Sequence, residues 1–353
     1  MAEPLSAVDA VSPALDHTRN HLFRPFRFAK WARLAVITFL SGEVIGGGTG
    51  GTGFQFPVPP PSGGGNGESF FLQSSPVEQR FLEFLPWILL GVLALFGLVL
   101  VWMFIRSVFR FILFDAVLHD RWHLRAGWSR WARRASSFFL WQLGFSLLFL
   151  VVLGLVVGLP VLLAVHAGWF EQASQHVGGL VLGVLALLLL VFVTVAAGLV
   201  VDALARDFVV PVMALADVGV LEGWRRALPL MSGAKLSFAG YIGMKIVLAI
   251  AAGILFGILG AIAVLLIVVP LVILGAVLGV AGFFSALAWT PATIALVAVA
   301  ALLALALIIY VVAFISVPAA VFFQSYTLHF YAGRYPPLGA ALTGAQAPAS
   351  TAG

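Results

Sequence analysis

Long apolar runs without charge alternate with shorter polar segments along this chain. Residues 84–105, 138–164 and 178–201 contain no Lys, Arg, Asp or Glu, and neither does the stretch from Ile246 to Gly333. A helix needs about 20 apolar residues to cross the hydrocarbon core of a bilayer, because it rises about 1.5 Å per residue. Each of the three runs therefore predicts one transmembrane helix, and the long stretch predicts at least two.

An earlier apolar segment, residues 31–47, is weaker because it is short and carries Arg33 and Glu43. Arg33 is long enough to reach lipid headgroups from the edge of the apolar region. We interpret this segment as a short or tilted span, with an interfacial helix as the alternative. Residues 46–65, which follow it, are so rich in Gly and Pro that they predict a flexible external loop.

The order of these segments predicts an all-α fold, a polytopic transmembrane helix bundle with about six spans and cytoplasmic amphipathic connecting helices. The spans are expected to pair as three hairpins, 31–47 with 84–105, 138–164 with 178–203, and 237–262 with 291–318. Residues 263–290 then form a re-entrant or bent apolar segment. The alternative is seven spans, with 263–285 as a full span and the C-terminus outside.

The two ends of the chain are more polar than its middle. Residues 1–30 predict a cytoplasmic tail and an interfacial segment, because they lack the short basic start and apolar run of a signal peptide. Residues 31–334 make up the predicted transmembrane domain. Residues 335–353 predict a disordered C-terminal tail.

Composition supports the membrane class independently of the pattern. Hydrophobic residues make up 62% of the chain and charged residues only 9%, whereas soluble domains carry roughly 25% charged residues. The chain has no cysteine, which excludes disulfides, thiolate metal sites and cysteine nucleophiles. No Walker, Gly-x-Ser-x-Gly or His-Glu-x-x-His motif is present either. We therefore predict no catalytic residue and no cofactor.

The distribution of Lys and Arg predicts the orientation. Residues 106–134 contain seven arginines, whereas residues 165–177 contain no Lys or Arg. Because short cytoplasmic loops are enriched in these residues, the N-terminus, the 106–137 segment and the 202–235 segment are expected to face the cytoplasm. With six spans the C-terminus is cytoplasmic too. The predicted location is the inner (plasma) membrane of a bacterial cell.

A faint internal repeat links two of the predicted cytoplasmic segments. Residues 110–130 and 207–226 each contain Asp and each end in Gly-Trp-x-Arg. The sequence Gly223-Trp224-Arg225-Arg226-Ala227, together with Arg24-Pro25-Phe26-Arg27-Phe28, resembles the membrane domain of the glycerophosphodiester phosphodiesterase superfamily and related bacterial six-span proteins. The hydrolase of that superfamily is a separate barrel domain, which we do not expect here. The resemblance therefore implies a fold and a location, not that hydrolysis.

The strongest candidate for a metal site is the quartet Asp115, His119, Asp120 and His123. His and Asp are typical ligands of zinc and related ions, and His119 and His123 would lie on successive turns of one helix face. The favoured interpretation is an ordinary amphipathic helix whose polar flank holds the quartet. Its apolar face, which would contact lipid or core, comprises Phe111, Phe114, Leu118 and Trp122.

Two further groups predict binding or packing. Tryptophans alternate with Arg125, Arg130, Arg133 and Arg134, a pattern that favours anionic lipid headgroups and also sets topology. Nucleic-acid binding is not expected, because the sequence shows no folded basic reader. Gly253 and Gly257 form a small-xxx-small pattern, which predicts close helix packing within the chain or in a homo-oligomer.

Taken together, the sequence favours a non-catalytic scaffold, an accessory protein or a lipid-interacting component, with membrane lipids and a second membrane protein as expected partners. One alternative is a transporter or channel for an uncharged or amphipathic solute, which would need a polar path between spans. The other is a lipid-modifying enzyme at the cytoplasmic face, which would need the Asp115–His123 side chains to converge on one cavity.

Overall fold

The computed structural model describes residues 4–44, 76–169, 177–280 and 290–346, and within these ranges every regular element is a helix. The elements in chain order are α1 (Val11–Phe23), α2 (Phe28–Ser41), α3 (Pro76–His119), α4 (Leu124–His166), α5 (Val177–Leu204), the π-helical turn η1 (Ala205–Val209), α6 (Val210–Ala216), α7 (Val220–Gly233), α8 (Lys235–Val280), α10 (Pro291–Ala332) and α11 (Pro336–Gln346).

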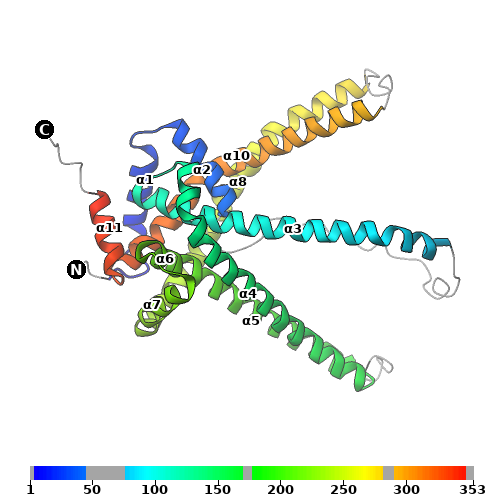
Figure 1. Ribbon diagram of the computed structural model, residues 1–353, viewed down its shortest axis with the longest axis horizontal. Coiled ribbons are helices and arrows are strands. Elements are labelled where there is room, and N and C mark those ends of the chain that lie inside the picture. The colour runs from blue at the N-terminus through cyan, green and yellow to red at the C-terminus, as the bar shows by residue number, and fades with distance from the viewer. Residues whose placement is uncertain (1–3, 45–75, 170–176, 281–289, 347–353) are drawn as a thin grey trace.

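The molecule has one head and three arms that diverge from it (Figure 1). The first arm is the outer part of α3, the second is the α4–α5 hairpin, and the third is the α8–α10 hairpin. α3, α4, α8 and α10 are 42 to 46 residues long, which corresponds to roughly 63–69 Å at 1.5 Å per residue. The hydrocarbon core is only about 30 Å thick. The inner ends of these helices therefore continue into the head.

Five helices among the described residues are long and apolar enough to cross a membrane: Phe84–His119, Leu124–His166, Val177–Ala216, Lys235–Val277 and Pro291–Ala332. Their most apolar windows are almost entirely exposed within the chain. Such surfaces are stable against lipid and not against water. The chain is thus a membrane protein with an all-α, multi-span fold, as predicted, and the α4–α5 and α8–α10 pairings match two of the predicted hairpins.

The expected first span, residues 31–47, is wrong as a membrane-crossing helix. α2 begins at Phe28 and ends after 14 residues at Ser41, a length of only about 21 Å. Gly42 stops it by adopting a left-handed conformation with φ of 78°, which suits a residue without a Cβ. α2 instead packs in the head, with Leu34 and Ile37 fully buried.

The expected re-entrant segment at 263–290 is also wrong over the described part, as is a separate seventh span at 263–285. α8 runs without interruption from Lys235 to Val280, with Pro270 inside it. In an apolar run of this length no polar residue is available to begin a turn, and membrane helices tolerate an internal proline. The described residues therefore contain five helices of spanning length, where six or seven were expected.

Residues 4–23 and 336–346 are folded into the head, which corrects the expectation of a disordered tail at 335–353 over its described part. Residues 336–346 form α11, whose Leu338 and Leu342 are buried. α1 packs against α10, and the Tyr326 hydroxyl donates to the carbonyl of Ala7 at 2.9 Å. Residues 347–353 lie outside the described residues, as does the predicted loop at 46–65.

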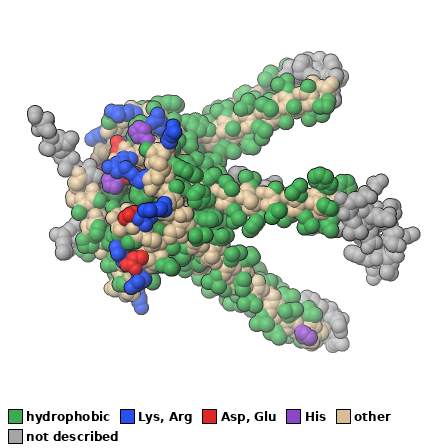
Figure 2. Space-filling model, viewed as in Figure 1, with side chains coloured by type: hydrophobic (Ala, Val, Ile, Leu, Met, Phe, Trp, Pro, Cys, Tyr) green, Lys and Arg blue, Asp and Glu red, His purple; other side chains and the backbone are tan. Residues whose placement is uncertain are grey.

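The hydrophobic core lies wholly in the head. It joins α1 and α2 to the inner ends of α3 and α10 and to α6, with fully buried aromatic side chains at its centre. Phe208, Tyr241 and Phe330 form one aromatic group, with ring centroids 4.6–6.1 Å apart. Figure 2 shows the charged side chains gathered on this head, while the arms present a hydrophobic surface.

Candidate functional site in the head

A buried ionic cluster lies where α2, α3 and α5 meet at the base of the arms. Arg206 of η1 is at its centre, with a side chain only 4% exposed. Its Nη2 is 3.0 Å from Oδ2 of Asp202, one turn earlier, and its Nη1 is 4.0 Å from Oε1 of Glu43 at the end of α2. Because an unpaired buried charge is costly, this pairing fixes the end of α2 against α5.

Two arginines of α3 extend the cluster. Nε of Arg106, and Nε and Nη1 of Arg110, are buried and have no hydrogen-bond partner among the described residues. The Arg110 guanidinium lies over the Phe138 ring, 5.8 Å from its centroid, a contact that attracts the cation to the aromatic face. Arg106 lies where a Cβ on Gly42 would be. Gly42 therefore both ends α2 and makes room for this arginine.

A second polar group begins at Asp207, directly after Arg206 in the π-helical turn. Its Oδ2 accepts from Lys245 Nζ at 2.6 Å and from the Tyr241 hydroxyl at 3.0 Å, and that hydroxyl is 2.7 Å from Thr327 Oγ1. The adjacent residues Arg206 and Asp207 thus bind different arms, since one pairs with α2 and α5 and the other with α8. π-helical turns are frequent at functional positions.

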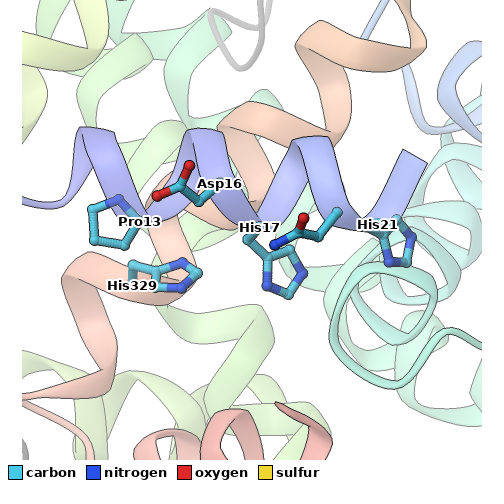
Figure 3. A pocket seen from close by; sticks show the side chains of 6 residues that line it. Pro13, Asp16, His17, His21 and His329 are labelled. Atoms are coloured by element: carbon cyan, nitrogen blue, oxygen red, sulfur yellow. The ribbon is translucent and has the colours of Figure 1, made fainter. Parts of the chain in front are cut away.

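A hollow of about 650 Å³ opens beside α1, on the head (Figure 3). It is lined by Pro13, Asp16, His17, Asn20, His21 and His329. The His17 ring lies between the other two, with centroids 5.9 Å from His21 and 5.4 Å from His329. His17 Nε2 donates to the carbonyl of Val117 at 3.2 Å, and His329 Nδ1 donates to the carbonyl of Ser325 at 2.8 Å.

The histidines of α1 are poor bases in this position. Burial lowers the pKa of His17, and the nearby His329 lowers it further. Burial and then the Lys30 ammonium lower the pKa of His21 to about 4, although the Asp120 carboxylate acts in the opposite direction. Both rings are therefore neutral near pH 7, and in that form His17 donates to the carbonyl of Val117 on α3.

The predicted quartet does not form one site. Asp115 is buried in the head, where it accepts from His119 Nδ1 at 2.9 Å and Arg130 Nη1 at 3.2 Å. Asp120 ends α3 and lies 2.7 Å from Lys30 Nζ. His123 stacks on Trp122 at the start of α4. Within the ranges that the structure describes, no group of three or more His, Cys, Asp or Glu is placed to hold a metal ion.

The favoured interpretation of that segment as a surface helix is wrong in part. Phe111, Phe114 and Leu118 are buried and contact the core. They were expected to contact either lipid or the core. Asp115, however, lies on no polar flank, since it is 3% exposed. The helix is surrounded because α2, α4, α10 and α11 pack around the inner end of α3, and His17 of α1 contacts the carbonyl of Val117.

The four arginines predicted to bind headgroups divide into two pairs. Arg130 contacts Asp115 at 3.2 Å, and Arg134 Nε donates to Asp217 Oδ1 at 2.6 Å. Arg125 and Arg133 are exposed and make no ion pair with the described residues. Headgroup binding by these residues stays a prediction, and two of the four have intramolecular partners.

Gly253 and Gly257 do not pack against another helix of the chain. A Cβ placed on either glycine would have no described atom within 4 Å. Close packing within the chain is therefore the wrong explanation for this pattern, and the homo-oligomer alternative stays a prediction. By contrast, a Cβ on Gly223 would lie 2.8 Å from Val209, so the close helix approach is in the head.

Sequence reasoning missed Arg206 at the centre of the ionic cluster and the histidines His17 and His21 of the hollow beside α1. His17 and His21 have the same i, i+4 spacing as His119 and His123, so a local signal existed. The pairing of Glu43 with Arg206 had no local signal, because the two residues are far apart in the sequence and only the fold brings them together.

These features define an α-helical membrane protein with an ion-paired head and lipid-exposed arms. The chain belongs to a family of unknown function (DUF7544), which matches residues 5–341. No curated protein and no solved structure matches the chain. The family match gives no link to the phosphodiesterase membrane domain, so that resemblance stays a prediction.

Proposed function

We propose that this protein is a non-catalytic, lipid-contacting membrane scaffold, whose three arms anchor a folded head at the cytoplasmic face of the plasma membrane. The observation that carries the proposal is that almost no residue in the most apolar part of each arm is buried within the chain. The most apolar windows of four of the five long helices have none of their residues buried within the chain. Lipid or another membrane protein must cover these surfaces, because they cannot face water.

The distribution of basic residues supports the orientation. Of the 19 Lys and Arg residues, only Arg80 lies towards the far end of an arm. All the others lie in the head or where the arms enter it. The sequences of the segments 45–75, 170–176 and 281–289 contain no Lys or Arg. Because basic residues favour the cytoplasmic side, their concentration in the head supports a cytoplasmic head.

The placement of the buried charges supports a mechanical role over a chemical one. Arg206 and Asp207 join α2, α5 and α8, and neither residue lines the two hollows found beside α1. A buried ion pair used in this way fixes the relative placement of helices. The alternative of a lipid-modifying enzyme built on Asp115, His119, Asp120 and His123 has less support, because only Asp120 of these four lines either of the two hollows beside α1.

The absence of cysteine from the sequence makes a direct test practical. Single cysteines at Leu93, Leu188 and Ile258, which are 67%, 60% and 56% exposed, place one probe on each arm. Nitroxide labels there are expected to collide with oxygen dissolved in the bilayer and not with a water-soluble nickel chelate. A matched label at Arg225, 82% exposed on α7, is expected to show the reverse.

The proposal fails if the three arm labels are as accessible to the nickel chelate as the α7 label. Reagent that cannot cross the membrane should modify the Arg225→Cys protein only in inverted vesicles, and labelling in intact cells would overturn the orientation. Mass spectrometry of protein extracted in native-lipid nanodiscs then separates the two kinds of scaffold. A stoichiometric protein would identify an accessory role, whereas lipid alone would identify a lipid-anchored one.

A further inference from the structure

A second hollow, of about 210 Å³, lies between the end of α1 and the beginning of α2. It is lined by Asn20, His21, Arg24, Pro25, Arg27, Lys30, Asp120 and Trp122. Three of these residues are cationic and one is acidic, so the hollow is electropositive.

The single carboxylate in this hollow is already neutralised. Lys30 Nζ is 2.7 Å from Asp120 Oδ1 and also donates to the carbonyl of His21 at 2.7 Å. The side chains of Arg24 and Arg27 are exposed and form no ion pair or hydrogen bond with the described residues. Two guanidinium groups therefore remain free to bind an anion, in a geometry that suits phosphate or carboxylate oxygens.

His21 provides an independent indication of a ligand. Its side chain is only 9% exposed, and its Nε2, 3.8 Å from Asp120 Oδ1, is buried without a hydrogen-bond partner among the described residues. Buried polar atoms are normally paired, and an unpaired one in a native site calls for a water, an ion or a ligand. Because His21 lines this hollow, a bound oxyanion would supply the missing partner.

The loop that carries the two arginines lies at the level where the head meets the arms. Phe23, Phe26 and Phe28 alternate with Arg24 and Arg27 and are 51%, 56% and 63% exposed. The Phe28 ring is 5.6 Å from the ring of Phe314, on the part of α10 where its exposed arm enters the head. Exposed aromatic rings beside basic side chains are typical of segments that lie in the membrane interface.

We propose that this hollow binds the phosphate group of an anionic phospholipid, with Arg24 and Arg27 on the phosphate oxygens and the three phenylalanine rings among the adjacent acyl chains. The inference deepens the proposed function, because it requires the head to lie against the bilayer. The same phosphate chemistry could come from a soluble phosphorylated compound. The loop phenylalanines favour the lipid, since a soluble ligand would not need them.

The test uses the full chain, delipidated in detergent and titrated with phosphatidylglycerol or with phosphatidylcholine, with bound lipid counted by native mass spectrometry. The wild-type protein is expected to prefer phosphatidylglycerol. The double variant Arg24→Gln/Arg27→Gln is expected to lose that preference by about fivefold for each arginine. The matched control Arg225→Gln/Arg226→Gln removes the same charge from exposed positions on α7 and is expected to bind as the wild type does.

An equal loss of phosphatidylglycerol preference in both double variants would show general attraction to a basic head and would overturn the site. No loss of preference in either variant would overturn it too. Calorimetric titration with inorganic phosphate distinguishes the source of the ligand. Arginine-dependent binding of inorganic phosphate without any phosphatidylglycerol preference would replace the lipid by a soluble phosphate compound and overturn the proposal. If the lipid titration fails but the arm labels are accessible from the lipid, the scaffold function still stands. If the arm labels are accessible from water, both the scaffold function and the lipid site are overturned.

Discussion

The head and the arms are built from the same apolar residue types but are stabilised by different solvents. In the head, Leu34 and Phe111 are fully buried against other side chains of the chain. In the arms, Leu188 of α5 is 60% exposed and Leu266 of α8 is 71% exposed. Lipid tails are as apolar as leucine, so an arm gains little by covering such a residue with protein. The head instead buries its apolar groups against one another.

The head and the arms also differ in where their charged side chains lie. The buried ion pairs of the described residues lie in the head, where Asp207 joins the end of α5 to α8 and Arg206 joins it to the end of α2. The arms have no comparable connection, and they diverge beyond the head (Figure 1). We therefore expect the free energy of unfolding of the protein to depend on head residues and to be insensitive to the lipid-facing residues of the arms.

The largest effect is expected for Arg206→Leu. Removing this arginine leaves the carboxylates of Asp202 and Glu43 buried without their partner, which typically costs about 3–5 kcal/mol. Thermal unfolding in detergent, followed by near-ultraviolet circular dichroism, measures the loss. Arg225→Leu is the control, because Arg225 is 82% exposed, and it should change stability by less than about 0.5 kcal/mol.

A matched pair of leucines tests the role of the solvent directly. Leu34→Ala, at a fully buried position of α2, is expected to lower the free energy of unfolding by about 2–5 kcal/mol, because it leaves a cavity. Leu188→Ala, at an exposed position of α5, should cost less than about 0.5 kcal/mol in lipid nanodiscs, because lipid fills the space. Equal costs would mean that the arms are packed against protein.

Acidification should loosen α1 before the arms respond. Since burial and Lys30 lower the pKa of His21 to about 4, against about 6.5 in an unfolded chain, the unfolded form binds more protons between these two values. Stability is therefore complete above pH 6.5 and falls as the pH drops towards 4, by on the order of 3 kcal/mol. Hydrogen exchange of α1 amides at pH 7.5 and pH 5 measures this loss.

The matching variant is His21→Gln, which cannot be protonated in this range. It should flatten the pH dependence of exchange in α1, although His17, whose pKa burial also lowers, keeps part of it. An unchanged pH profile in this variant would assign the effect to other groups.

The smallest effect on stability is expected for Gly→Ala, and the same substitution at two positions provides the comparison. Gly223→Ala in α7 places a methyl group 2.8 Å from Val209 Cγ1 and 3.0 Å from Met213 Cγ, and such overpacking costs about 1–3 kcal/mol. Gly253→Ala in α8 meets no described atom within 4 Å, so the helix should be as stable or slightly more stable. Destabilisation or loss of a dimer by Gly253→Ala would instead support the predicted homo-oligomer.

Sequence reasoning located most of the lipid-exposed helices but not the site. The runs 138–164 and 178–201 lie within α4 and α5, because an uncharged run of this length is a local property of the chain. Residues 31–47 were misjudged, since hydropathy alone does not show that Gly42 ends α2 in a left-handed turn beside Arg106. The re-entrant or bent segment expected at 263–290 was misjudged as well, because α8 continues through Pro270 to Val280.

By itself, the sequence determined the membrane class, the positions of the arms and the concentration of basic residues at one side, because each follows from local composition and the cost of placing polar groups in lipid. Only the tertiary structure decided that the inner ends of the helices form a head. It also decided that Arg206 pairs with Glu43 and that Asp115 is buried beside Arg130. Such contacts depend on which surfaces meet in space, and no local pattern records that.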